Sequence, residues 1–179
     1  MNWDLTDIPE VLRPALAERL AQLGETAASP LSGHDAFASL PLVWACSDFV
    51  ADACLRDGGV LPWLLDGRRL LDGVTEDVLN ADLASGLEPA GDDAHFMDAL
   101  RRFRRRQLVR IAWRDIAGFA DVQTILAELS LLADVCIRAA CRRAGAALAA
   151  RHGVPVGADG TPLELMVLGM GKLGGGELN

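Results

Sequence analysis

The stretch Leu100-Arg-Arg-Phe-Arg-Arg-Arg-Gln-Leu-Val-Arg-Ile-Ala-Trp-Arg-Asp-Ile-Ala-Gly118 decides the fold. Its apolar residues recur at the spacing of one face of a helix. Asp92 or Asp93 can cap a helix that runs through this stretch to about Ala117, where Gly118 breaks it. The sequence therefore predicts one long helix here.

A second long helix follows almost at once. Asp121 can cap it, and it continues to about Arg151, before Gly153 and Pro155. Because only a short break separates the two long helices, we expect them to be antiparallel neighbours. Together they predict a mainly α protein.

Seven arginines lie between Arg101 and Arg114, a density that on its own suggests binding to a polyanion. Most of them fall outside the apolar arc of the helix, so we expect a solvated face that pairs with acids. Arg104 and Arg114 fall inside the arc, where each guanidinium needs a buried carboxylate, which we favour, or an anionic ligand. The arc comprises Phe96, Met97, Leu100, Phe103, Leu108 and Ile111, and the candidate carboxylates are Asp115, Asp121 and Asp134.

Shorter helices are expected upstream. Residues 14–23 fit a helix with proline at its first position and a glycine after its last. The apolar period of residues 41–57 predicts one further helix, which a glycine pair ends. Residues 60–91 are rich in glycine and proline, so only short helical turns are expected there, one of them near residues 76–83.

Composition excludes several classes of protein. The 179 residues are 51% hydrophobic, which argues for one compact core, and the net charge of −8 argues against general binding to nucleic acid or an anionic membrane. No secretory signal and no uncharged run of about 18 residues occur, so no membrane span is expected. The four cysteines are expected to be small buried residues in a reducing cytoplasm, and no histidine or cysteine has the spacing of a metal site.

The last part of the chain changes in character. Residues 153–162 have the glycine, proline and aspartate of a surface connection. The apolar run 163–168 predicts a short buried strand. Five glycines then surround one cation, Lys172, a composition that lets backbone N–H groups close on a phosphate while the ammonium neutralises its charge.

Two general phosphate-binding motifs fit this turn incompletely. A P-loop would need a glycine five residues before Gly171 and a Ser or Thr after Lys172, where Met166 and Leu173 stand. The dinucleotide fingerprint G-x-G-x-x-G is present at residues 169–174. However, three consecutive glycines then lie where its helix should begin, each costing about 1 kcal/mol relative to Ala.

The segment Gly169-Met-Gly-Lys-Leu-Gly-Gly-Gly-Glu-Leu-Asn179 resembles the signature of the first nucleotidyltransferase domain of the glutamine synthetase adenylyltransferase/adenylyl-removing enzymes. Residues 100–118, with Ala120-Asp-Val-Gln-Thr124 and Glu128-Leu-Ser-Leu-Leu-Ala-Asp134 after them, are similar to the helical region that precedes this domain. The segment Trp44-Ala-Cys-Ser-Asp-Phe-Val-Ala51 resembles the N-terminal region of the family. The first two of these resemblances occur in the order that the family has, which is hard to explain by chance.

The resemblance implies a helical N-terminal region at residues 1–152, a connection at 153–162, and a second part at 163–179. That last part would be the first strand and glycine turn of a truncated polymerase-β-like α/β nucleotidyltransferase domain. In the family this domain removes AMP from an adenylylated tyrosine of glutamine synthetase by phosphorolysis, which regulates nitrogen assimilation. The implied partners are glutamine synthetase and the signal protein PII, and the implied cofactors are Mg²⁺ with ATP, ADP or phosphate.

For the site itself, the resemblance implies that Gly174 and Gly175 contact phosphate through their backbone, with Lys172 as the accompanying cation. No catalytic residue and no metal ligand is expected within this chain, because the Ser-Asp-x-Asp carboxylates of the family would follow Asn179. We therefore expect the fragment to be inactive alone. The family usually has Arg where this chain has Gly176.

Two other classes stay open at the level of sequence. One is a non-catalytic helical interaction or regulatory module, and the other is a fragment of an NAD-binding enzyme. A pair of acids shortly after the glycine turn would favour the transferase, whereas a lone acid about 20 residues on would favour the dinucleotide enzyme.

Overall fold

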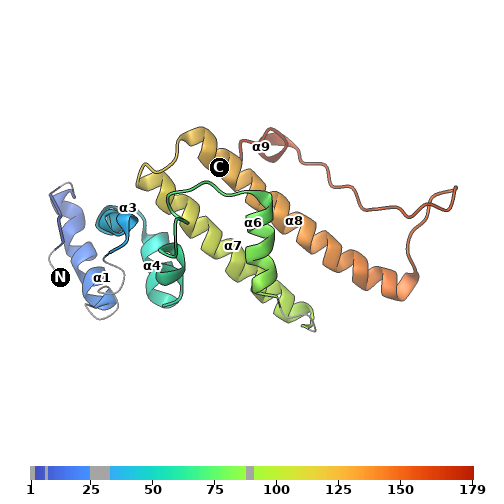
Figure 1. Cartoon of the computed structure of the whole chain (residues 1–179), viewed down its shortest axis with the longest axis horizontal. Helices are drawn as coiled ribbons and strands as arrows, with labels where there is room; N and C mark the ends of the chain where they lie inside the picture. The colour runs from blue at the N-terminus through green and yellow to red at the C-terminus, as the bar shows by residue number, and fades with distance from the viewer. Residues whose placement is uncertain (1–2, 7, 25–32, 88–90) are drawn as a thin grey trace. The chain divides into compact units, whose positions relative to one another are not determined.

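The protein is mainly helical in a computed structural model that describes residues 3–6, 8–24, 33–87 and 91–179 (Figure 1). Within these residues no β-strand is present, and one isolated antiparallel bridge joins Val156 to Pro162. The mainly α prediction is therefore confirmed. The elements are η1 (Glu10–Leu12), α1 (Arg13–Leu23), η3 (Asp35–Ser39), α3 (Leu40–Cys46), α4 (Asp48–Arg56), α5 (Val60–Leu64), α6 (Glu76–Ser85), α7 (Asp93–Ile116), α8 (Val122–His152) and α9 (Gly171–Gly174).

The chain divides into two compact units. The first comprises residues 1–74 and 105–125, and the second comprises residues 75–104 and 126–179. Helices α7 and α8 each contribute residues to both units.

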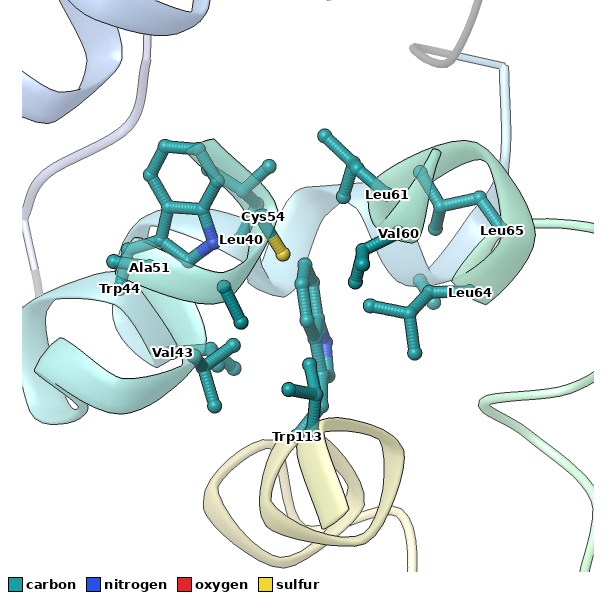
Figure 2. Packing of buried hydrophobic residues seen from close by; sticks show 14 of the residues in the cluster. Leu40, Val43, Trp44, Ala51, Cys54, Val60, Leu61, Leu64, Leu65 and Trp113 are labelled. Carbon is teal, nitrogen blue, oxygen red and sulfur yellow. The ribbon is translucent and has the colours of Figure 1, made fainter. Parts of the chain in front are cut away.

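Trp113 of α7 is the centre of the core of the first unit. Its side chain is fully buried and lies between residues of α3 and α4 on one side and residues of the α5 region on the other (Figure 2). The indole N–H donates a hydrogen bond to Ser39 Oγ at 2.8 Å, so this buried polar group is satisfied. The labelled residues around it are Leu40, Val43, Trp44, Ala51, Cys54, Val60, Leu61, Leu64 and Leu65.

The stretch predicted as one helix, residues 41–57, forms two helices instead. Helix α3 ends at Cys46, α4 begins at Asp48, and the chain bends by 115° between them. Ser47 has an extended backbone, and its Oγ accepts a hydrogen bond from the N–H of Val50 at 3.3 Å. This N-cap starts a new helix, and apolar periodicity alone does not detect it.

The break also changes which side chains are buried. Cys46 and Phe49, which the period placed on the apolar face, are exposed, whereas Cys54 is buried. Cys136 and Cys141 on α8 are half-buried. The expectation of buried cysteines therefore holds fully for Cys54 alone, because the bend at α3 and α4 turns Cys46 toward solvent.

Both long helices are confirmed, together with their predicted caps. The carboxylate of Asp92 accepts a hydrogen bond from His95 N–H at 2.9 Å, and that of Asp121 accepts one from Thr124 N–H at 2.8 Å. These backbone hydrogen bonds lower the pKa of both aspartates. Gly118, with φ of 69°, ends α7 as expected.

Within the second unit, the start of α7 lies beside the end of α8. Arg143 donates hydrogen bonds to Asp93 at 2.8 Å and to Gly91 O at 2.9 Å, and its guanidinium carbon lies 5.7 Å from the ring centroid of Phe96. The antiparallel arrangement is therefore confirmed in this unit. Arg138 of α8 also pairs with Glu76, which ties α6 to α8.

Among the described residues, no single helix is long and apolar enough to cross a membrane. One bent pair, Asp35–Cys46 with Asp48–Arg56, meets the requirement by length and composition only, and many of its apolar side chains are buried in the core of the first unit.

Residues 163–168 do not form the predicted buried strand. Leu165, Met166 and Leu168 are 76%, 79% and 77% exposed. A buried strand needs the N–H and C=O groups of neighbouring strands, and the described part of this chain contains no sheet to provide them.

Candidate phosphate-binding turn

The glycine turn consists of the single helical turn α9 and a Schellman motif that closes it. Gly176 N–H donates to Leu173 O at 3.1 Å, and Glu177 N–H donates to Lys172 O at 2.8 Å, so carbonyls at the helix end are satisfied. Gly176 has φ of 70°, the left-handed conformation that this motif places after the helix. Gly176, where the resemblance implies Arg, therefore has a conformational role here.

Gly174 is required by the turn itself. A Cβ at this position would lie 2.5 Å from the carbonyl oxygen of Gly169, closer than backbone atoms can tolerate. A Cβ on Gly175 would meet Gly171 O at 3.5 Å, which is an ordinary contact. Steric crowding within the turn therefore explains why residue 174 is glycine. It does not explain why residue 175 is glycine, although both were predicted to contact phosphate.

Hydrogen bonds within the turn already occupy two of the predicted phosphate-binding groups. Gly175 N–H donates to Gly171 O at 3.0 Å, and the ammonium of Lys172 donates to the side chain of Asn179. Lys172, Gly174 and Gly175 lie together in one exposed turn. A phosphate contact from the Gly175 N–H would require the bond to Gly171 to open.

The segment after the turn is attached to α8. Leu178 N–H donates a hydrogen bond to Ser130 Oγ at 3.3 Å, and Ser130 is buried. Reasoning from the sequence missed Ser130, because nothing local reveals a partner 48 residues further along the chain.

Of the two arginines predicted inside the apolar arc, Arg114 is buried, at 2% exposure. Its guanidinium donates hydrogen bonds to the carbonyl oxygens of Leu70 and Asp72, each at 2.7 Å. These bonds support a structural role for Arg114 over binding of an anionic ligand. The acceptors are backbone carbonyls, whereas the sequence prediction favoured a carboxylate.

Arg104 is exposed, so its predicted place in the apolar arc is wrong. Arg110 is buried instead and donates to Arg69 O and Asp72 O, both at 2.8 Å. The sequence prediction used a single apolar arc for the whole of α7. The part of α7 that belongs to the first unit buries a wider face than that arc. That face comprises Gln107, Val109, Arg110, Ile111, Trp113 and Arg114.

The described residues offer no cluster of metal ligands at the turn. Within the described ranges, no group of three or more His, Cys, Asp or Glu side chains could hold a metal ion, so these residues do not fit Mg²⁺. A pocket of about 490 Å³ lies in the second unit, and no residue of the turn lines it. Its lining includes Leu83, Phe96, Ala139, His95, Arg142 and Arg143.

Comparison with known proteins places residues 100–134 and the glycine turn in one family. The sequence model of the glutamate-ammonia ligase adenylyltransferase family matches residues 37–179, a range that contains α8 and the whole glycine turn. The chain belongs to this family. The resemblance carried by residues 100–134 and 169–179 is thereby confirmed.

Relatives of this adenylyltransferase family cover nearly the whole chain. The bifunctional glutamine synthetase adenylyltransferase/adenylyl-removing enzyme of Thioalkalivibrio sulfidiphilus is 38% identical over 173 residues, which are 96% of this chain and 18% of the relative. The enzymes of the same name from Nitrosococcus oceani and Pseudomonas aeruginosa are 35% and 36% identical, over 100% and 98% of this chain and 19% of each relative. The chain thus spans about a fifth of the length of the curated relatives that it matches.

Proposed function

We propose that this chain is the helical region and the glycine turn of an adenylyl-removing domain. In that role it contributes to the removal of AMP from an adenylylated tyrosine of glutamine synthetase by phosphorolysis, which releases ADP. The observation that carries the proposal is the family match, which extends through the glycine turn to residue 179. The relatives are named for both addition and removal of adenylyl groups.

In this proposal the turn supplies backbone contacts to phosphate. Gly174 and Gly175 would bring their backbone close to phosphoryl oxygens, and Lys172 would add a positive charge near them. Lys172 and Gly175 are engaged with Asn179 and Gly171 in the structure, so binding would exchange these internal bonds for bonds to phosphate.

The cofactors and the regulatory partner are part of the same proposal. Mg²⁺ neutralises phosphoryl charge in such reactions, and its ligands would lie outside the described residues, which hold no acidic cluster. Glutamine synthetase is the proposed substrate, PII the proposed regulator, and the cytoplasm the proposed compartment.

The first test measures ADP release from adenylylated glutamine synthetase with phosphate and Mg²⁺. We expect the 179-residue chain to release no ADP above the blank, because a phosphoryl-transfer site without metal carboxylates lacks its main electrostatic stabiliser. A longer protein that continues through the rest of the domain should release ADP. EDTA-sensitive turnover by the 179-residue chain would contradict the first expectation.

The second test uses the difference between the two glycines in the longer protein. Gly175→Ala fits the turn sterically and should keep most of the activity, whereas Gly175→Val should lose it if the backbone there approaches phosphate. Gly174→Ala should disrupt the turn in either case, so it serves as the structural control. Full activity of Gly175→Val would show that the turn takes no part in the mechanism. Binding of NAD without AMP removal would favour the dinucleotide enzyme.

Gly176→Arg tests the departure from the family pattern. An Arg at φ of 70° is strained by about 1–2 kcal/mol, so we expect the substitution to destabilise the closed turn seen here. A rise in ADP release would show that the charge of the Arg outweighs this strain.

A further inference from the structure

The hydroxyl of Ser130 joins α8 to the glycine turn. Its Oγ donates a hydrogen bond to Leu126 O at 2.9 Å and accepts one from Leu178 N–H at 3.3 Å. Ser130 is only 8% exposed. One buried side chain thus uses its donor inside its own helix and its acceptor on the segment that follows the turn.

Leu178 is linked directly to the geometry of the turn. The preceding residue, Glu177, closes the Schellman motif by donating its N–H to Lys172 O at 2.8 Å. Leu173 and Leu178 are half-buried, whereas the other residues of 169–179 are exposed. The hydrogen bond to Ser130 therefore joins the turn segment to α8, and two leucines of that segment are partly covered.

Two segments that resemble the family, residues 128–134 and 169–179, meet at this hydrogen bond within the second unit. We propose that Ser130 is a positioning residue that holds the glycine turn on α8 in one orientation. The helical region then supports the phosphate-binding turn directly. The catalytic consequence rests on the proposed function, whereas the attachment of the turn to α8 does not.

The attachment is tested by hydrogen exchange in the 179-residue chain. Ser130→Ala removes the acceptor, so the Leu178 amide should exchange about threefold to tenfold faster, the range expected for the loss of one hydrogen bond. Ser130→Thr keeps a hydroxyl and should exchange like the wild type. Thermal unfolding followed by circular dichroism shows whether each variant keeps its helices.

Ser85→Ala is the matched control. Ser85 Oγ likewise donates to a carbonyl of its own helix, Asp82 O at 2.8 Å, but among the described residues it holds no second segment. This variant should leave Leu178 exchange unchanged. Unchanged exchange in a folded Ser130→Ala protein would overturn the proposal.

The catalytic consequence is tested in the longer protein through phosphate-dependent ADP release. Ser130→Ala should lower kcat about threefold to tenfold, and Ser130→Thr should restore it, because only the hydroxyl matters to the turn. Full activity of Ser130→Ala in an active longer protein overturns the positioning role. No AMP removal by the wild-type longer protein overturns the proposed function instead, and the exchange measurement then decides the attachment alone.

Discussion

Arg114 shows how a charged residue inside an apolar arc can serve the fold. It donates to Leu70 O and Asp72 O and so holds the segment before α6 against α7. Arg114→Met keeps most of the buried volume but removes both of these hydrogen bonds, although Asp72 O keeps the one from Arg110. We expect the free energy of unfolding to fall by about 2–3 kcal/mol.

Urea unfolding of the full chain measures this change. Arg102→Ala on the exposed face of α7 is the control and should stay within about 0.5 kcal/mol of the wild type. Equal midpoints for Arg114→Met and wild type would show that solvent replaces the lost donor.

Cys54 predicts a dependence of stability on alkaline pH. Burial is the main cause that raises the pKa of Cys54 to about 12. The thiol of the unfolded chain ionises near its ordinary pKa of 9.0, so between that pH and about 12 the folded state keeps a proton that the unfolded state loses. Stability is therefore fully present below pH 9.0 and falls as the pH rises above it.

We expect the contribution of Cys54 to fall by about 1 kcal/mol per pH unit in this window. Urea unfolding at about pH 8 and about pH 10.5 measures the slope, which Cys54→Val should reduce and Cys46→Ala, an exposed control, should not. The chain has no tyrosine and a single lysine, Lys172, but burial also raises the pKa of Cys136. The part of the slope that Cys54→Val removes is therefore the contribution of Cys54. An unchanged slope in Cys54→Val would assign it to other groups.

At the scale of elements, Ser47 decides that residues 40–56 form two helices. Its Oγ caps α4, so Ser47→Ala should lower the free energy of unfolding by about 1 kcal/mol. Ser47→Asp provides another capping oxygen and should restore most of that loss. Chemical denaturation compares the three proteins, and wild-type stability in Ser47→Ala would mean that packing alone holds the bend.

The apolar run at residues 163–168 has no neighbouring strand among the described residues. Its residues have the composition of a strand, yet Leu165, Met166 and Leu168 are exposed because the described residues include no sheet. In the proposed longer domain we expect this segment to pair with further strands.

At the scale of the whole molecule, hydrogen exchange should distinguish the long helices from the segment at residues 164–178. Amides within α7 and α8 should be protected, amides 164–168 should exchange fast, and those of Gly175 to Leu178 should lie between because they have internal acceptors. Mass spectrometry of the exchanging chain measures this order. Strong protection of residues 164–168 would show that the run pairs with a strand of another copy.

The sequence by itself determined the two long helices, several helix ends and the family. Helix α7 is readable from Asp92 to Gly118 because caps and periodicity are local properties, and the two motifs are specific enough to name the family without any structure. Only the tertiary structure decided what depends on distant partners. Arg110 is buried where the carbonyls of Arg69 and Asp72 accept its hydrogen bonds, and Ser130 holds Leu178 across 48 positions of sequence. Burial and hydrogen bonding between remote segments arise from packing, which no local period records.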